Sequence, residues 1–453
     1  MKSIYVVAPL LLALSLVCFG QTEPPPAPLP DSPKGPLAAP LSVDEAVAEA
    51  LQSNPEIRAS LRRQSLAQLK TTTARSLDDP MFMVRDWQTP LTKPWDLNQA
   101  QMMFSVQKTF QSKEKRDVRA KVAGDDVGTA SSDLESIRQE VAAEVRKSCA
   151  DLMRNGDERK LLDRQDALLK EALNVTLVQY TTGKVPQADV LRAQMALTRL
   201  DEQLIGLDEE RDAVRAGLNT LLGRRPDEEL EISGNYAAPG DLPSIEELER
   251  LAILHRPELA GLRTQIVKSK DEGQATRLAM KPDFTAALGY MLMPAGSGSR
   301  NAYMAEMTIN LPWLNRDRHD GEAKQADAVT AVTEAELEAR TSAVFLEVRQ
   351  AQIATLAAER RQKVYRDTLM PQAEAAFKAS TAAYQNNRAE FLTLIDSQNL
   401  LLDIQTAYYR ALAAADTGVA ELERAIGTPL PRSSEATPDA SDTDHSSTNR
   451  RSK

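Results

Sequence analysis

The acidic side chains of this sequence are numerous, but their spacing does not suit acid–base catalysis. Asp78 and Asp79 are neighbours, as are Asp125 and Asp126, and the side chains of neighbouring residues diverge. The other carboxylates recur at helical-surface spacing, which is typical of solvated faces. The sequence also has no Gly-rich phosphate loop and no nucleophile elbow. It predicts a protein that is not an enzyme.

Histidine and cysteine, the usual ligands of transition metals, are few and far apart. The three histidines, His255, His319 and His445, have no ligand spacing, so we expect no metal centre and no cofactor. The two cysteines are Cys18, in an apolar N-terminal segment, and Cys149. If that segment is removed, Cys149 has no disulfide partner, and the protein must be stabilised by packing or assembly.

A short polar motif that begins at Tyr180 recurs 204 residues later, at Tyr384. Gly183 and Asn387 hold equivalent places, and these two residue types most readily enter the left-handed conformation at a helix C-terminus. Pro186 suits the first turn of a returning helix. Both copies of the motif therefore predict a helix–turn–helix tip.

The two tips differ in the charged residues that follow them. Asp189 and Arg192 in the first copy take the places of Thr393 and Asp396 in the second. Taken alone, Asp396 has the pattern of an ordinary solvated helix residue.

The tip motif belongs to a repeat of about 200 residues, which predicts two copies of one structural unit. The run Pro55-Glu56-Ile57 returns 202 positions later as Pro257-Glu258-Leu259. Pro80 returns at the same distance as Pro282. An inference about one half of the chain can therefore be checked against the other.

Beyond Pro80 and Pro282 the apolar period changes from about 3.6 to about 2, which indicates strands. Residues 284–292 and 303–311 alternate clearly around a turn rich in Gly and Ser, and residues 101–107 do so less regularly. We expect one strand hairpin at about 81–111 and another at about 283–313. Strands of about 10 residues are long enough to cross a membrane when tilted. Alternation alone equally suits a soluble hairpin packed on helices.

Long helices must position the tips. Residues 113–180 and 319–384 contain no proline except Pro371, which predicts about 65 residues, or about 100 Å, of helix in each half. The returning segments repeat apolar residues in steps of three and four, from Val190 to Leu221 and from Leu394 to Ala425. The simpler interpretation of these heptads is a plain antiparallel coiled coil.

Composition agrees with a mainly α fold and limits the partners. Only 4% of the residues are aromatic and 26% are charged, which is little material for a large globular core. The net charge of −10 and the pI of about 5.2 argue against a nucleic-acid partner, because binding phosphates requires a concentrated basic face.

The ends of the chain differ from the repeats. Residues 1–20 predict a signal peptide cut after Gly20, and the rival prediction is a lipoprotein acylated at Cys18. Residues 21–40 predict a Pro-rich linker, and residues 428–453 a disordered C-terminal tail. Between them we expect a first repeat at 41–223, a connector at 224–243 and a second repeat at 244–427.

Four strands per chain are too few for a closed barrel, which needs about eight. An open sheet of four strands would leave its edges unpaired. A membrane role therefore requires several chains to pool their strands.

The run Tyr-x-x-Gly-x-x-x-x-x-Asp-Val-Leu-x-Ala-Gln from Tyr180, with the duplication and the Asn54-Pro55-Glu56 start, resembles the outer-membrane factors of the TolC type. The heavy-metal efflux branch is the part of that family it resembles most. The resemblance covers about residues 41–427. It implies a mainly α fold with a small β part, in a homotrimer. Long α-helical hairpins would form a periplasmic tunnel, and four strands per chain a 12-stranded β-barrel in outer-membrane lipid.

The resemblance also implies functional residues at the tips. In that family, aspartates near the inner tip close the tunnel entrance and bind cations. Here Asp189 and Arg192 match these positions in the first copy, and Thr393 and Asp396 in the second. Thr393 departs from the family's double aspartate, so only Asp396 carries over from that pair. Three copies of Asp396 around one axis would repel one another and attract cations.

The tips would also dock to a periplasmic adaptor, a membrane fusion protein, and through it to an inner-membrane pump of the resistance-nodulation-division type. The expected adaptor contacts are Tyr180, Gly183, Pro186, Asp189, Tyr384 and Asn387. The sequence thus favours a passive exit duct of a tripartite efflux system, conducting metal ions or small toxic compounds across the outer membrane. The alternative is a soluble periplasmic coiled-coil scaffold or adaptor.

Overall fold

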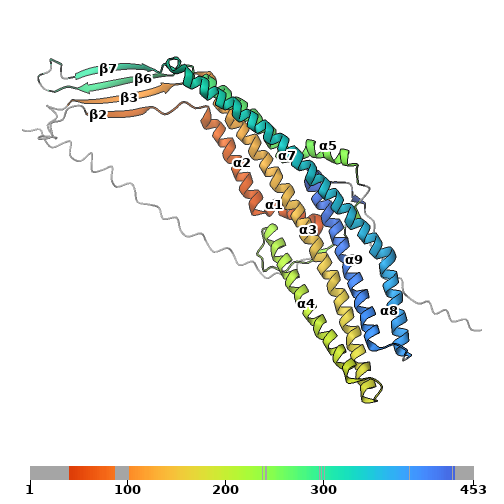
Figure 1. The fold of residues 1–453 in the computed structure, drawn as a ribbon. Helices are drawn as coiled ribbons and strands as arrows, with labels where there is room; N and C mark the ends of the chain where they lie inside the picture. Colours follow the sequence, from red (N-terminus) through yellow and green to blue (C-terminus); the bar gives the residue numbers. More distant parts are fainter. Residues whose placement is uncertain are drawn as a thin grey trace, which may run out of the picture. The chain divides into compact units, whose positions relative to one another are not determined.

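The computed structural model describes residues 40–86, 101–236, 238–239, 242–294, 296, 298–299, 301–386, 388–430 and 432–433. These residues belong to one compact unit that begins at Pro40, and they are mainly helical with a small β part (Figure 1). The expected signal peptide, almost all of the Pro-rich linker, most of the polar tail and Asn387 lie outside the described residues.

The two halves of the chain have a similar order of helices and strands. The first run is α1 (Val43–Ser53), α2 (Pro55–Ala74), β2 (Met81–Asp86), β3 (Met102–Phe110), α3 (Lys113–Thr181) and α4 (Gln187–Leu221). The second is α5 (Ile245–His255), α6 (Pro257–Leu278), β6 (Phe284–Leu292), β7 (Asn301–Ile309), α7 (Arg316–Val364), α8 (Met370–Gln385) and α9 (Phe391–Ile426).

Local sequence signals explain where the short helices begin. Ser42 and Glu45 form a capping box at the start of α1, and Ser244 accepts a hydrogen bond from the backbone at the start of α5. Pro55 and Pro257 open α2 and α6, where a missing N–H costs nothing. Among the described helices, none combines the length and the apolar character that a membrane span requires.

A buried polar residue ties each short helix pair to the end of a long helix. Asn54 caps α2, and its side-chain amide donates to the Leu221 carbonyl over 2.9 Å. Arg256, 202 positions later, places its Nη1 3.4 Å from the Ala425 carbonyl. Two chemically different side chains, 202 positions apart, therefore satisfy carbonyls near the ends of long helices.

Glycines follow these helix ends because the backbone is crowded there. Gly223 and Gly427 both have a left-handed φ, of 74° and 76°. A Cβ on Gly223 would lie 2.5 Å from the Ser53 carbonyl oxygen, and a Cβ on Gly427 would lie 2.7 Å from that of His255. A larger residue at either place would force the helix end away from the short helix pair.

One antiparallel sheet of four strands, in the order β2-β3-β6-β7, joins the two halves of the chain (Figure 1). Its central pair is β3 with β6, in which Val106 lies opposite Leu288. Because alternate residues of a strand point to opposite faces, the register assigns every strand residue to one of two faces. Two much shorter pairs lie elsewhere: β1 (Leu41–Ser42) with β4 (Ile232–Ser233), and β5 (Ala238–Pro239) with β8 (Arg432–Ser433).

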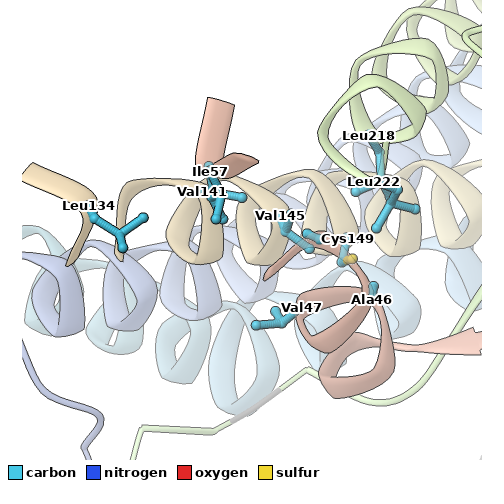
Figure 2. Close-up of a cluster of buried hydrophobic side chains, with 10 residues drawn as sticks. Ala46, Val47, Ile57, Leu134, Val141, Val145, Cys149, Leu218 and Leu222 are labelled. Carbon is cyan, nitrogen blue, oxygen red and sulfur yellow. The ribbon is translucent and has the colours of Figure 1, made fainter. Parts of the chain in front are cut away.

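Buried apolar side chains form separate clusters along the helices. In one cluster, drawn in Figure 2, Val145 and Cys149 of α3 are buried with Ile57 of α2 and Leu218 of α4. A second cluster holds Leu248 of α5 with residues of α6, α7 and α9. A third joins α3, α4 and α9 near the tips. The long helices are therefore held together at intervals rather than by one central core.

The second long helix is not continuous α-helix, which corrects the expectation from the sequence. A π-helical segment, Tyr365–Leu369, separates α7 from α8. Pro371 lies just beyond it and has no N–H to donate to the carbonyl four residues earlier. The π-helical turn next to Pro371 accommodates the missing backbone hydrogen bond, so the helix continues beyond the proline.

Residues 428–430, at the start of the expected tail, pack against the helical part of the protein. Leu430 is buried against α5 and α7, and its N–H donates to Glu423 Oε1 over 3.1 Å. The strand β8 also lies in this segment. Because the tail is mostly polar, its sequence gave no sign that Leu430 anchors its beginning.

Candidate functional site

The first tip joins α3 to α4 in the tight turn that the sequence predicts. Gly183 has a φ of 73°, and the Lys184 N–H donates to the Gln179 carbonyl over 2.8 Å. Pro186 is the N-cap residue of α4, and with Gly183 and Tyr180 it is exposed. Three of the expected docking residues therefore lie together on an accessible turn.

The second tip joins α8 to α9 and closes in a similar way. The Arg388 N–H donates to the Ala383 carbonyl over 2.8 Å. Asn387, one of the expected docking residues, lies outside the described residues. Tyr384 packs its ring against the buried Phe391, with 5.7 Å between ring centroids.

The two tips contact each other, which the sequence did not reveal. The Tyr384 hydroxyl donates to Gln179 Oε1 over 3.0 Å, from one tip to the other. Because Tyr384 is fixed by Phe391 at the same time, this bond sets the position of the second tip against the first. No spacing signal marks Gln179, since its partner lies 205 residues away.

Of the four expected gate residues, only Asp189 is buried, and Arg192, Thr393 and Asp396 are exposed. Asp189 is only 9% exposed, and its Oδ1 lies 3.2 Å from Arg192 Nη1 one turn along α4. Thr393 and Asp396 are exposed on α9. The carboxylate of Asp189 thus has a cation beside it, whereas that of Asp396 is exposed to solvent.

A hollow of about 460 Å³ lies between α3, α4 and α9 next to the tips, and it brings opposite charges together. Arg192 and Arg199 line it from α4, and Asp396 and Asp403 line it from α9. Residues seven apart lie on one helix face, so each helix presents two like charges to the hollow. Neither Arg199 nor Asp403 is among the gate residues predicted from the sequence, although each lies one heptad beyond one of them.

Farther along the helices, a buried ion pair on α3 binds one exposed charged side chain from α4 and one from α9. Arg154 lies 3.0 Å from Glu158 on its own helix and 2.6 Å from Glu210 on α4. Arg410 of α9 lies 3.2 Å from the same Glu158. These ion pairs link the two returning helices, and with them the charged hollow, to α3.

The described residues contain no group of three or more His, Cys, Asp or Glu side chains able to hold a metal ion. Cys149 is buried in α3, and burial raises the pKa of its thiol to about 12. The thiolate form that would act as a nucleophile or a metal ligand is therefore strongly disfavoured.

The arrangement of hairpins and sheet matches solved structures closely. CusC, solved in work on folding and transmembrane channel formation, superposes with a TM-score of 0.71 over 90% of this chain and 99% of its own, at 13% identity. This chain has the fold of the TolC-type outer-membrane channels. The predicted mainly α fold of that type, with a small β part, is confirmed. The MtrE outer-membrane channel of Neisseria gonorrhoeae shares the TolC-type fold, with a TM-score of 0.70 over 87% of this chain and 91% of its own.

A curated relative is also similar over most of its length. The cobalt-zinc-cadmium resistance protein CzcC of Cupriavidus metallidurans is 21% identical over 394 residues, which cover 86% of this chain and 91% of the relative. No protein-family model matches the chain. The likeness at the level of the TolC-type fold is thus clearer than the likeness in sequence.

Proposed function

We propose that this protein is the outer-membrane exit channel of a tripartite efflux system. It passively conducts metal ions or small toxic compounds that a periplasmic adaptor and an inner-membrane pump deliver. The name of the relative CzcC favours metal ions as cargo. The pump supplies the energy, so the channel itself needs no catalytic site.

The main support for this proposal is that one face of the sheet exposes large apolar side chains. Leu288 is 70% exposed and Tyr303 89% exposed, although both are apolar or aromatic. The register puts them on the same face as other exposed apolar residues: Phe82, Val84, Val106 and Met307. The opposite face carries polar residues such as Gln107, Thr285 and Glu306.

An exposed apolar face of this kind is unfavourable in water and is the pattern of strands that face lipid. In the described residues, β2 and β7 are the outer strands of the sheet, and each pairs on one side only. Three chains contributing four strands each would give a 12-stranded barrel without edges. We therefore propose a homotrimer whose apolar face contacts outer-membrane lipid and whose two repeats, copies of one unit, form a periplasmic helical tunnel.

The tips supply the docking surface and the gate. The exposed turn at Tyr180, Gly183 and Pro186 is available to the adaptor, and so is Tyr384 in part. The gate residues are those named from the sequence, with Asp396 as the exposed carboxylate of the set. Asp189 contributes through its ion pair with Arg192.

The gate is tested by Asp396→Ala in planar bilayers, with Asp133→Ala as the control, an exposed carboxylate of α3 outside the charged hollow. We expect Asp396→Ala to keep the trimer intact, to raise ion conductance and to weaken block by cations. Unchanged conductance and unchanged block in this variant would remove Asp396 from the gate.

The function itself is tested by cell fractionation and by the oligomeric state. The full-length protein, expressed in its host, should be recovered with outer membranes and migrate as a trimer after mild detergent extraction. Recovery as a soluble periplasmic monomer would contradict the channel and favour the coiled-coil scaffold.

A further inference from the structure

Methionine is concentrated in the four-stranded sheet. Seven of the 13 methionines of the chain lie in β2, β3, β6 and β7, which together make up a small part of its length. The alternation of the strands divides these seven between the two faces. Met102 and Met307 lie on the exposed apolar face described above, and the other five lie on the opposite face.

Four of those five form a row across the sheet, one from each strand. Met103 of β3 lies directly opposite Met291 of β6. Met83 of β2 pairs with Ser105, two residues from Met103, and Met304 of β7 pairs with Gly289, two residues from Met291. Directly opposite residues have Cβ atoms about 5 Å apart, and diagonal neighbours about 7–8 Å, which long side chains can bridge. We call Met83, Met103, Met291 and Met304 the methionine row.

The centre of the row is buried. Met103 is only 3% exposed, so its side chain is covered by its neighbours on this face. Gly289 leaves room beside it, because the Met304 methyl lies 3.6 Å from the place of a Cβ on residue 289. A side chain at position 289 would separate Met304 from the rest of the row.

Two sulfurs of the row already accept hydrogen bonds. Arg85 Nη2 lies 3.4 Å from Met83 Sδ, and Gln101 Nε2 lies 3.6 Å from Met291 Sδ. Both sulfurs therefore lie within reach of polar side chains, and a bound cation would displace these donors from the thioether lone pairs.

We propose that the methionine row is a binding site for a soft monovalent cation, Cu(I) or Ag(I). Thioethers are soft, neutral ligands that favour Cu(I), whereas zinc and cobalt prefer nitrogen, oxygen or thiolate. The inference rests on the proposed function, in which this face of the sheet lines the channel. Neutral thioethers bind such an ion without a counter-charge to retain it. The row would therefore act as a stepping point in the exit path, because conduction requires sites that release as well as bind.

The test is silver binding to the full-length protein in detergent and chloride-free nitrate buffer, measured by equilibrium dialysis with elemental analysis. Three proteins are compared: the wild type, a row variant and a control variant. The row variant carries M83L, M103L, M291L and M304L, and the control carries M102L and M307L on the other face of the same sheet. Leu for Met conserves volume, so the fold should be retained.

We expect the wild type and the control to bind Ag(I) with equal affinity and the row variant to bind at least tenfold more weakly. Zn²⁺ should bind none of them at the row. Cys149 is present in all three proteins, so any silver that it binds does not change the difference between them. If the row variant does not assemble, the central pair M103L and M291L should still weaken silver binding.

Absence of silver binding to the wild type, or equal binding by the row variant, would overturn the inference. Bilayer conductance of the same preparations keeps the two proposals apart. A wild type that conducts but binds no silver leaves the channel standing and removes the metal site. A wild type that is absent from outer membranes and forms no channel contradicts the proposed function instead.

Discussion

Replacing Arg256 by methionine should destabilise the helical part of the protein more than any change of a surface ion pair. Arg256 is 1% exposed, and its Nε lies 3.0 Å from Glu258 Oε2. Its guanidinium also bonds Glu347 of α7 and reaches the Ala425 carbonyl of α9. One side chain thus links the start of α6 to two long helices.

The expected loss in the free energy of unfolding depends on how well Glu258 and Glu347 are solvated and paired once Arg256 is replaced. Breaking a buried ion pair typically costs about 3–5 kcal/mol, because the remaining charge stays buried without its partner. Here the side chains of Glu258 and Glu347 are both 29% exposed, and Arg340 stays 3.0 Å from Glu347. Partial solvation and the second cation therefore place the expected loss in the free energy of unfolding at the lower end, about 3 kcal/mol.

The pH dependence gives a second, independent readout. Burial alone would raise the pKa of Glu258, but hydrogen bonds from Arg256 and the backbone outweigh it and lower that pKa. A carboxyl group whose pKa is lowered in the folded state stabilises the protein above its unfolded pKa of about 4.3. That contribution disappears as the pH falls through the folded pKa. The gap between wild type and Arg256→Met should therefore shrink between about pH 5 and pH 3.

The assay is urea denaturation of the detergent-solubilised protein, followed by helical circular dichroism at neutral and acidic pH. The control is Arg225→Met, whose partner Asp227 lies 3.1 Å away on the surface, and no measurable loss is expected from it. A loss for Arg256→Met no larger than for the control, or a gap that does not shrink on acidification, would refute the reasoning.

Two further outcomes follow from the packing. A Cβ on Gly418 would lie 2.8 Å from Thr355 Oγ1 and 3.1 Å from its Cα, whereas a Cβ on Gly217 would meet nothing within 4 Å. Gly418→Ala should therefore lower the melting temperature, because the added methyl group clashes with Thr355. Gly217→Ala should raise it, because alanine favours helix over glycine by about 1 kcal/mol. A shift of the melting temperature in the same direction for both variants would contradict this account. Burial raises the pKa of the Cys149 thiol to about 12, so at pH 8 a maleimide should label it only after urea is added, and rapid labelling of the folded protein would count against its burial.

The sequence predicted those features that depend on local pattern. Alternation in residues 284–292 predicted a strand with the bounds of β6, and the place of Gly183 predicted the first tip. The two faces of the sheet also follow from alternation, because a strand has a fixed period of two.

Features that depend on register or on distant packing could not be predicted. Met103 and Met291 are adjacent only because β3 and β6 pair in one register, and a slip of one residue would move them to opposite faces. Asn54 and Arg256 both bond a carbonyl near the end of a long helix, but they are different residue types, so the sequence gave no sign of this shared role. The bond from Tyr384 to Gln179 arises from the packing of two hairpins, which heptads leave undetermined.

The central claim is that one face of the sheet contacts lipid, and a fluorescent probe on each face tests it most directly. Leu288→Cys places the probe on the apolar face, and Glu306→Cys places it on the opposite face of the neighbouring strand. After labelling and reconstitution into vesicles that contain brominated lipid, the account predicts strong quenching at position 288 and little at position 306. Equal quenching at the two positions, or none at 288, would contradict it.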